Sequence, residues 1–457
     1  MTTTGKAQVS VCIAGESRRV WFGVCDELIS DLILGLPALQ LFKITLDFER
    51  SQLSIPVNGK RLNYALEPGP RIPDVNVIRE GSDSATSAVY QPLRLNAQQE
   101  RELTDLYEEF SDIFSDVPGE CTQPPIELTL KEGTAPIKRF PYRFTGPRLA
   151  QLREHLTEME EQGIIEAHFG AWSFPCFIIP KPHGAAGTRF VVDFRPLNKV
   201  LEEQPYPLPT ISQQLASLEG SVVFSAIDLS SGYHQLRLSE RSSNIATITT
   251  PFGNYRFKRL PQGILSGTYN FQAAMDRVLG ECKWRYASPY LDDILVYSKS
   301  VEQHIVHLRD VFSRLRAAGL NIKKSKCFFF MSKLKYLGHV VSADGIRPDP
   351  TYVKAILALP SPTSVKELQR TLGRLTWTSK FIPDYAILAR PLFALLRKGA
   401  KWEWTLEHED CFRQLKEMLV KDPVLAHPDM QSPFILQTDA SALGYVAVLY
   451  QVRGDGL

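Results

Sequence analysis

The sequence lacks the features that mark exported and membrane-spanning proteins. In 457 residues, no apolar run approaches the ~18–20 residues that a membrane-spanning helix needs. The first residues, Met1-Thr-Thr-Thr-Gly, lack the basic-then-apolar order of a secretory signal. Seven scattered cysteines form no CxxC pair and have no histidine at zinc-ligand spacing, which argues against a disulfide framework and a zinc site. We therefore expect an intracellular, cytoplasmic protein with reduced thiols.

Neither the composition nor the pattern indicates a disordered or fibrous chain. Hydrophobic residues make up 44% and charged residues 22%, as in ordinary globular proteins, and the length predicts several domains. The net charge of +2 is unevenly distributed: residues 1–134 carry 12 Lys and Arg against 20 Asp and Glu, whereas residues 135–345 carry 26 against 18. A basic middle region favours a phosphate-rich partner.

Apolar periodicity predicts a mixture of strands and helices, and therefore an α+β or α/β domain in the middle of the chain. Short β-branched runs predict a small β-rich unit that ends near Ile55, followed by a segment rich in Pro, Gly, Ser and acidic residues. We expect strands over residues 174–180, 189–194, 222–227, 245–249 and 290–297 and helices over 96–114, 147–163, 269–279, 301–320, 390–398 and 406–420.

Two adjacent carboxylates interrupt the apolar run Tyr290-Leu-Asp-Asp-Ile-Leu-Val-Tyr. In a continuous strand neighbouring side chains face opposite ways, so at least one unpaired charge would be buried, at a cost of several kcal/mol. A tight hairpin turn at Asp292 and Asp293 removes this conflict and lets both carboxylates reach one site. The alternative is a pair of ordinary turn aspartates, because Asp is common where strands end.

A third acid, Asp228, ends the apolar strand that begins at Phe224. If this strand pairs beside the hairpin, the three carboxylates could share metal ions. Hard oxygen ligands with room for water and phosphate suit Mg²⁺ better than zinc. Two such ions, ~3.5–4 Å apart, stabilise the attacking and leaving oxygens of a phosphoryl transfer. Taken alone, Asp228 is also compatible with a structural role.

Tyr290-Leu-Asp-Asp together with Asp228 resembles the catalytic signature of reverse transcriptases, and nearly the whole chain is similar to the polyprotein of gypsy-type LTR retrotransposons. The resemblance implies a right-hand polymerase with fingers, palm and thumb. Further matching stretches follow in the family's order: Glu161-Gln-Gly-Ile-Ile-Glu, Ala171-Trp-Ser-Phe-Pro, Arg189-Phe-Val-Val-Asp-Phe-Arg-Pro-Leu-Asn-Lys, Tyr206-Pro-Leu-Pro, Asp228-Leu-Ser-Ser-Gly-Tyr-His-Gln, Leu260-Pro-Gln-Gly, Lys326-Cys, Tyr336-Leu-Gly-His, Gly345-Ile-Arg-Pro-Asp-Pro and Gln437-Thr-Asp-Ala-Ser.

The resemblance also implies the domain order. We expect an incomplete C-terminal part of a retropepsin-like protease over residues 1–60, an acidic linker with a helix over 61–134, fingers and palm over 135–345, a helical thumb and connection over 346–430, and the beginning of a truncated RNase H-like domain over 431–457.

For the site, the resemblance implies that Asp228, Asp292 and Asp293 are the catalytic acids and ligands of two Mg²⁺ ions, with Mn²⁺ as a possible substitute. The reaction would be attack of a primer 3′-hydroxyl on the α-phosphorus of a dNTP, with an RNA or DNA template. The implied nucleotide-binding residues are Lys181 and Arg189 at the triphosphate, Tyr233 as the barrier to a 2′-hydroxyl, and Gln262 beside the nucleotide. The implied primer contact is Leu337, Gly338 and His339.

The protease-like and RNase H-like ends of the sequence are not expected to have enzymatic activity. Asp31-Leu-Ile-Leu-Gly resembles the C-terminal half of a retroviral-type protease, but no Asp-Ser-Gly or Asp-Thr-Gly triplet occurs in the chain, so proteolysis is not expected. Asp439 matches the first acid of an RNase H domain, and only Asp455 follows it, so RNase H activity is not expected either. Both ends suggest a fragment of a larger polyprotein, located in the cytoplasm, in virus-like particles or in the nucleus.

Two other functions stay open at this point. A degenerate or host-adopted copy would bind nucleic acid without polymerising, and its mark would be the loss of an acid, whereas all three are present. A metal-dependent nuclease would rest on Asp439 alone.

Overall fold

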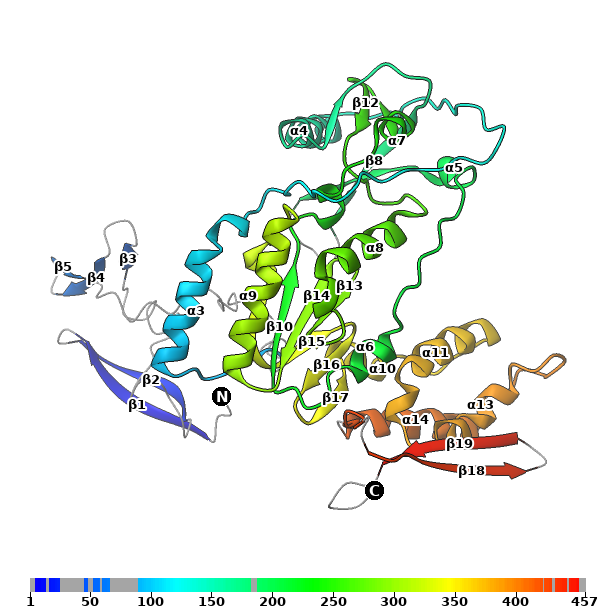
Figure 1. Ribbon diagram of the computed structural model, residues 1–457. Helices are drawn as coiled ribbons and strands as arrows, with labels where there is room; N and C mark the ends of the chain where they lie inside the picture. The colour runs from blue at the N-terminus through cyan, green and yellow to red at the C-terminus, as the bar shows by residue number, and fades with distance from the viewer. Residues whose placement is uncertain are drawn as a thin grey trace. The chain divides into compact units, whose positions relative to one another are not determined.

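The computed structural model of the chain describes residues 5–13, 16–24, 45–47, 52–57, 60–65, 89–181, 187–421, 423–429, 432–441 and 444–451 (Figure 1). The chain divides into two compact units, Met1–Asp74 and Val75–Leu457. Across the described ranges, no helix combines the length and the apolar character that a membrane crossing requires.

The N-terminal unit is built from antiparallel strands. One pair comprises β1 (Gly5–Ile13) and β2 (Glu16–Val24), and a second sheet comprises β3 (Thr45–Asp47), β4 (Gln52–Val57) and β5 (Lys60–Ala65). The predicted end of the β-rich unit near Ile55 was therefore too early, because β5 continues the sheet. The protease-like stretch that begins at Asp31 lies outside the described residues.

An antiparallel sheet forms the centre of the larger unit and corresponds to the palm. Its order is β13–β14–β10–β15–β16–β17, and β6 pairs with β15 outside this path. Helices α8 (Gly267–Leu279) and α9 (Val301–Ala317) pack against it (Figure 1). The strands are β6 (Gln91–Pro92), β10 (Val223–Asp228), β13 (Ala287–Tyr290), β14 (Asp293–Ser298), β15 (Phe328–Tyr336), β16 (His339–Ser342) and β17 (Gly345–Pro348).

A second sheet, with helix α4 (Pro147–Glu161) against it, corresponds to the fingers. Leu152, Leu156 and Met159 of α4 are buried at the three- and four-residue spacing that predicted this helix. The sheet order is β7–β12–β11–β8–β9. Its strands are β7 (Ile165–Ala167), β8 (Phe174–Pro180), β9 (Thr188–Val192), β11 (Thr247–Thr250) and β12 (Gly253–Phe257).

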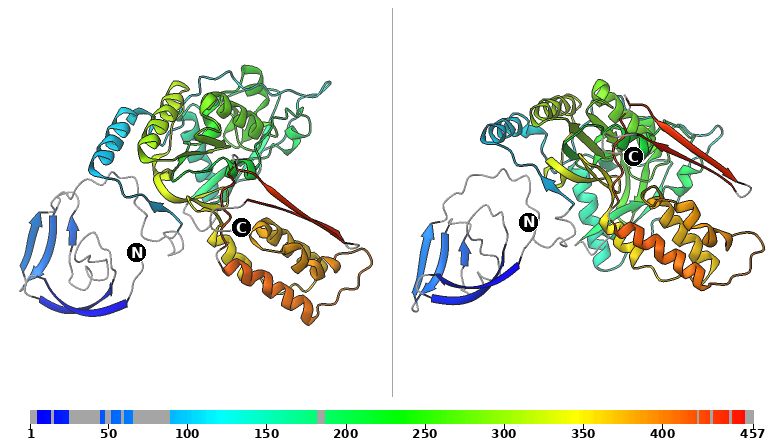
Figure 2. Two further views of the ribbon diagram at one scale, coloured as in Figure 1. Left: turned by 60° about the horizontal axis from the view of Figure 1, so that its bottom comes forward. Right: turned by 90° about the horizontal axis from the view of Figure 1, so that it is seen from below.

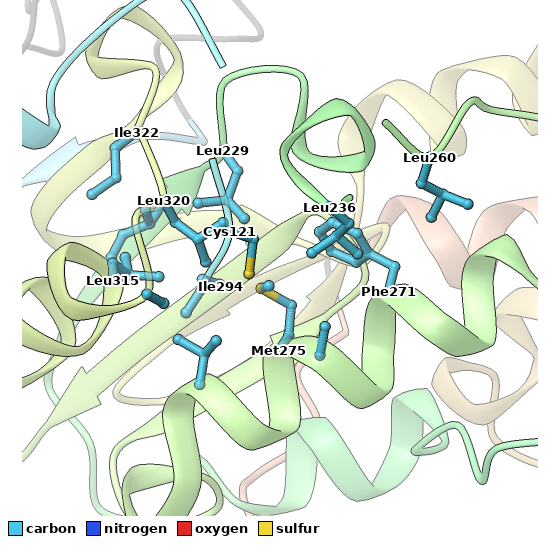
Figure 3. Packing of buried hydrophobic residues seen from close by; sticks show 14 of the residues in the cluster. Cys121, Leu229, Leu236, Leu260, Phe271, Met275, Ile294, Leu315, Leu320 and Ile322 are labelled. Carbon is cyan, nitrogen blue, oxygen red and sulfur yellow. The ribbon is translucent and has the colours of Figure 1, made fainter. Parts of the chain in front are cut away.

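Residues 89–139, here called the belt, were expected to be mostly linker but are part of the polymerase core. Their helix α3 (Ala97–Glu109) lies along α9 (Figures 1 and 2), and the short helix η1 (Ser111–Ile113) follows. Phe110 is 1% exposed and packs edge to face against Phe312 of α9. Farther along, Cys121 lies in the same buried cluster as Met275 of α8 (Figure 3).

Helices follow the palm, as predicted for the thumb and connection. Ser364 caps α11 by accepting a hydrogen bond from the Glu367 backbone N–H. The C-terminal strands β18 (Ile435–Ser441) and β19 (Gly444–Tyr450) pair antiparallel. The helices are α10 (Pro350–Leu357), α11 (Val365–Thr378), α12 (Tyr385–Leu388), α13 (Arg390–Ala394) and α14 (Leu406–Val420).

Candidate active site

The Asp-Asp pair lies at a tight hairpin between β13 and β14, as the interrupted apolar run predicted. Tyr290 pairs with Asp293, so Leu291 and Asp292 form the turn and Asp293 opens β14. Leu291 has φ +55°, in the left-handed region that costs a non-glycine residue roughly 1–2 kcal/mol. The backbone at this turn is therefore strained, and it carries Asp292.

Asp228 ends β10, which pairs antiparallel with β14. Its direct partner across the two strands is Asp293. Directly opposed residues of an antiparallel pair have Cβ atoms about 4.5–5.5 Å apart, so these two carboxylates lie on one face of the sheet as neighbours. The structure thus brings together three acids that are widely separated in sequence.

Burial raises the pKa of all three acids, and neighbouring carboxylates add to this effect at Asp292 and Asp293. Partial burial, then the charges of Asp228 and Asp293, raise the pKa of Asp292 to about 6. Burial raises the pKa of Asp228, and burial and Asp228 raise that of Asp293. The Nζ atom of Lys326 lies 3.3 Å from Asp228 Oδ1 and opposes this effect. Mutual repulsion of this kind is relieved by a bound cation.

Asp292 also leaves an unused ligand atom. Its Oδ1 is buried and makes no hydrogen bond within the described part of the chain. Gly232 leaves room for it: a Cβ there would lie 2.9 Å from this oxygen and 3.1 Å from Phe271 Cζ, so the carboxylate or the ring would have to shift. No three His, Cys, Asp or Glu side chains among the described residues form a ready-made metal cage. The carboxylate oxygens of the acidic site therefore suit a cation that takes part of its ligands from water or phosphate.

Tyr233 follows Asp228 in the short helix η3 (Gly232–Gln235), and the structure places it beside the acids. Its ring stacks on Phe271, with centroids 4.9 Å apart, and its hydroxyl lies 3.4 Å from Thr268 Oγ1. Burial, and secondarily the charge of Asp292, raises its pKa. The ring is therefore held in one orientation by α8.

Lys181 and Arg189 lie on the hairpin of β8 and β9. Arg189 pairs with Ile179, and the Lys181 backbone N–H donates to the Gly187 carbonyl at 3.2 Å, which closes the base of the loop. Both side chains are exposed. Residues 182–186 of this loop lie outside the described residues, and none of the contacts among the described residues joins either cation to the three acids.

Gln262 is exposed in the turn after Leu260, and a residue that sequence reasoning did not single out fixes this turn. The Asn198 side chain donates to the Gly263 carbonyl at 2.8 Å and accepts from the Leu265 N–H at 2.9 Å. Asn198 belongs to the Arg-Pro-Leu-Asn stretch quoted for the resemblance. The motif therefore pointed to this residue but did not reveal its contact with the turn.

The Leu337-Gly338 turn joins β15 to β16, and it is packed by the thumb. Positive φ at both positions, 47° and 75°, gives a type I′ hairpin turn. His339 is only 1% exposed, and burial, then Lys380, lowers its pKa to about 4, so its ring is neutral and points inward. Trp377 of α11, which the sequence reasoning missed, packs against this turn. Its ring centroid lies 5.7 Å from that of His339, and a Cβ added at Gly338 would contact its ring.

Comparison with known proteins identifies this arrangement. Residues 179–341 match the family described as reverse transcriptase (RNA-dependent DNA polymerase). This part of the chain is thus similar to a reverse transcriptase domain. Residues 404–457 match the RNase H-like domain found in reverse transcriptase. This second match begins at the start of α14, before the expected boundary at residue 431.

The relatives are retrotransposon polyproteins, as predicted. The Transposon Tf2-3 polyprotein of Schizosaccharomyces pombe is 34% identical over 367 residues, which cover 79% of this chain and 27% of that polyprotein. The Tf2-7 polyprotein of the same organism matches with the same identity and coverage. The chain thus spans about a quarter of the length of these relatives.

Solved structures confirm the fold. The foamy viral protease-reverse transcriptase dRH in complex with double-stranded DNA has a TM-score of 0.72 and 20% identity, over 99% of this chain and 74% of that one. A foamy viral protease-reverse transcriptase in complex with double-stranded DNA has a TM-score of 0.70 and 24% identity, over 78% and 75% of the two chains. The reverse transcriptase domain therefore has the predicted right-hand polymerase fold.

Proposed function

We propose that the chain is an RNA-directed DNA polymerase of a retrotransposon, which adds dNTPs to the 3′-hydroxyl of a primer paired with an RNA or DNA template. The observation that carries this proposal is the pairing of Asp228 with Asp293 beside the turn that holds Asp292. We further propose that the chain works inside the cell as part of a larger polyprotein, because its relatives are such polyproteins.

Reverse transcriptases depend on divalent cations, and the donor set here fits Mg²⁺, with Mn²⁺ as a substitute. Asp228 and Asp292 are the proposed principal ligands, and Asp293 completes the acidic group. The raised proton affinity of the acids and the unpartnered Asp292 Oδ1 support this assignment. When bound, two such cations neutralise phosphate charge and favour the ionised primer hydroxyl.

The other side chains would position the nucleotide. The Tyr233 ring, stacked on Phe271, would exclude a 2′-hydroxyl and so favour deoxynucleotides. Arg189 and Lys181 are exposed cations that would form charge-assisted hydrogen bonds with the triphosphate. Gln262 would pack beside the nucleotide, in a turn that Asn198 holds in place.

The template-primer duplex is the proposed macromolecular partner. Its primer end would lie at Leu337 and Gly338, whereas the buried His339 would hold that turn in place. Arg370, Gly373, Arg374 and Trp377 are exposed at the three- and four-residue spacing of one face of α11. This face combines cations with an aromatic ring, a combination suited to the backbone of a nucleic acid. Two of the similar foamy viral structures are complexes, one with double-stranded DNA and one with an RNA/DNA hybrid.

The function is tested by primer extension on poly(rA)/oligo(dT) with the purified 457-residue chain. We expect dTTP incorporation with Mg²⁺ and none with EDTA. Asp292→Asn should lower incorporation by about a thousandfold, equivalent to ~4 kcal/mol, while leaving duplex binding intact. Asp105→Asn, at an exposed carboxylate of α3, is the matched control. Incorporation without metal, or equal activity in Asp292→Asn and wild type, would contradict the proposal.

A further inference from the structure

The strained turn that carries Asp292 has a side chain dedicated to it. The Leu291 backbone N–H donates to Gln272 Oε1 at 2.9 Å. The same amide group donates from Nε2 to the Pro289 carbonyl at 3.1 Å. Gln272 therefore bridges the last part of β13 and the first residue of the turn. It lies on α8 and is fully buried, at 0% exposure.

The orientation of this amide is fixed by Asp276. Gln272 Nε2 donates to Asp276 Oδ1 at 2.9 Å. Because an ionised carboxylate only accepts hydrogen bonds, Nε2 must face Asp276, and Oε1 must face the Leu291 N–H. An inverted amide would place a donor against that N–H. The turn and Asp276 therefore require the same orientation of Gln272.

Asp276 is itself held from two sides. Lys283 forms an ion pair with its Oδ2 atom, and both side chains are largely buried. The Tyr206 hydroxyl donates to the same atom at 2.7 Å. Tyr206 begins the Tyr-Pro-Leu-Pro stretch of the sequence, to which the proposed mechanism gives no role. A continuous set of contacts thus runs from Tyr206 and Lys283 through Asp276 and Gln272 to Leu291.

We propose that Gln272 is a positioning residue for Asp292, and that its amide, oriented by Asp276, holds the Leu291 turn in the conformation that presents the Asp292 carboxylate. This inference rests on the proposed polymerase function. Gln272 touches the turn backbone and not the carboxylate, so its loss should reduce the rate of the chemical step and leave binding unchanged.

Gln214 provides a matched control. It is also fully buried, and its Nε2 donates to the same Pro289 carbonyl at 3.1 Å. No hydrogen bond between Gln214 and Leu291 occurs among the described residues. Replacing either glutamine with Met removes a buried amide and a contact with Pro289. Only Gln272→Met also leaves the Leu291 N–H without its acceptor.

The experiment is steady-state dTTP incorporation on poly(rA)/oligo(dT) with Mg²⁺ by wild type, Gln272→Met and Gln214→Met. We expect Gln272→Met to lower kcat at least about thirtyfold, with KM for dTTP and the duplex Kd within about threefold of wild type, because a small displacement of a reacting group is costly. Gln214→Met should keep kcat within about threefold. Equal kcat in the two variants, or a loss confined to KM, would overturn the inference.

Hydrogen exchange of a peptide spanning the turn gives a readout that needs no activity. The Leu291 amide should exchange at least about tenfold faster in Gln272→Met than in Gln214→Met, because its acceptor is lost. Equal exchange would overturn the inference. A wild-type chain that extends no primer would contradict the proposed function, and the exchange comparison would still decide the role of Gln272.

A second variant covers the case in which Gln272→Met does not fold. Leu291→Gly removes the strain, because glycine adopts positive φ readily. In this background we expect Gln272→Met to fold, because the turn is no longer strained and depends less on the lost acceptor, as coupled residues show in a double-mutant cycle. A double variant that stays unfolded despite the Leu291→Gly change would show that Gln272 supports the core and not the turn, which would overturn the inference.

Discussion

Asp228 and Asp293 face one another directly across β10 and β14. The strand register therefore fixes their separation, and neither depends on a flexible loop for its position. A shift of one residue in this register would turn Asp228 to the opposite face of the sheet. The palm sheet is thus what makes a shared site of acids that lie far apart in the sequence.

Tyr233→Ala should weaken discrimination between deoxyribonucleotides and ribonucleotides. The ring that stacks on Phe271 would be lost, and with it the barrier to a 2′-hydroxyl. We expect the ratio of kcat/KM for dTTP over UTP to fall by about tenfold or more. Tyr233→Phe keeps the ring and should keep the ratio. An unchanged ratio in Tyr233→Ala would remove the proposed role.

Phe110→Ala should destabilise the polymerase core, because the belt is part of it. Phe110 is 1% exposed and packs against Phe312, with the Arg316 guanidinium 4.2 Å from its ring centroid. The expected loss in free energy of unfolding is about 3–5 kcal/mol, measured by urea denaturation. Phe140→Ala, at a ring that is 92% exposed, should change it by less than about 0.5 kcal/mol. Similar values for the two variants would show that the belt is a linker after all.

His304 should make the palm sensitive to acid. It is fully buried between Ser225 and Ser298, with hydrogen bonds of 2.7 and 2.8 Å, and burial, then His307, lowers its pKa to about 3. The unfolded chain binds a proton near pH 6.5 and the folded chain does not. The contribution of the neutral, buried His304 to the free energy of unfolding is therefore complete above pH 6.5. It is lost as the pH falls towards 3, by about 1.4 kcal/mol per pH unit.

Urea denaturation at pH 7.5 and 5.5 measures this effect. His304→Asn should lose less stability than wild type between the two pH values. His234 and His339, whose pKa values are lowered to about 4 by burial, then by Arg259 and Lys380 respectively, contribute in both proteins and cancel in the comparison. Identical pH dependence in wild type and variant would contradict the assignment.

Duplex binding should weaken steeply with salt, because counterions are released from the nucleic acid. Arg370 and Arg374 are exposed on α11 and are proposed to contact phosphates. Replacing each with Gln should reduce the slope of log Kd against log salt by about one. Arg413→Gln is the control, because Arg413 pairs with Asp410 and Glu417 on α14. A slope that is flat, or that falls only in Arg413→Gln, would exclude this face of α11.

The sequence predicted the elements whose cause is local. Helix α14 was predicted over residues 406–420 and observed as Leu406–Val420, because its apolar spacing lies within the segment itself, where Phe412, Leu415 and Leu419 are buried. The hairpin at Asp292 was predictable because no continuous strand could hold two adjacent charges.

Contacts between distant residues explain what was missed. The belt was expected to be linker because of its Pro, Gly and acidic content, although Leu103, Leu106 and Phe110 already followed a helical spacing and are buried. No sequence pattern indicated the role of the Gln272 amide, because its hydrogen-bond partners, Pro289 and Leu291, lie in another part of the chain. Only the folded chain shows such a contact.

The most direct test of the acidic site is to count bound metal ions. Mn²⁺ binding, followed by electron paramagnetic resonance, would be measured in a complex with template, a chain-terminated primer and dTTP. Wild type should bind about two ions per chain. Replacing both Asp228 and Asp292 with Asn should abolish this binding while the duplex stays bound. Retention of both ions in the double variant would contradict the account.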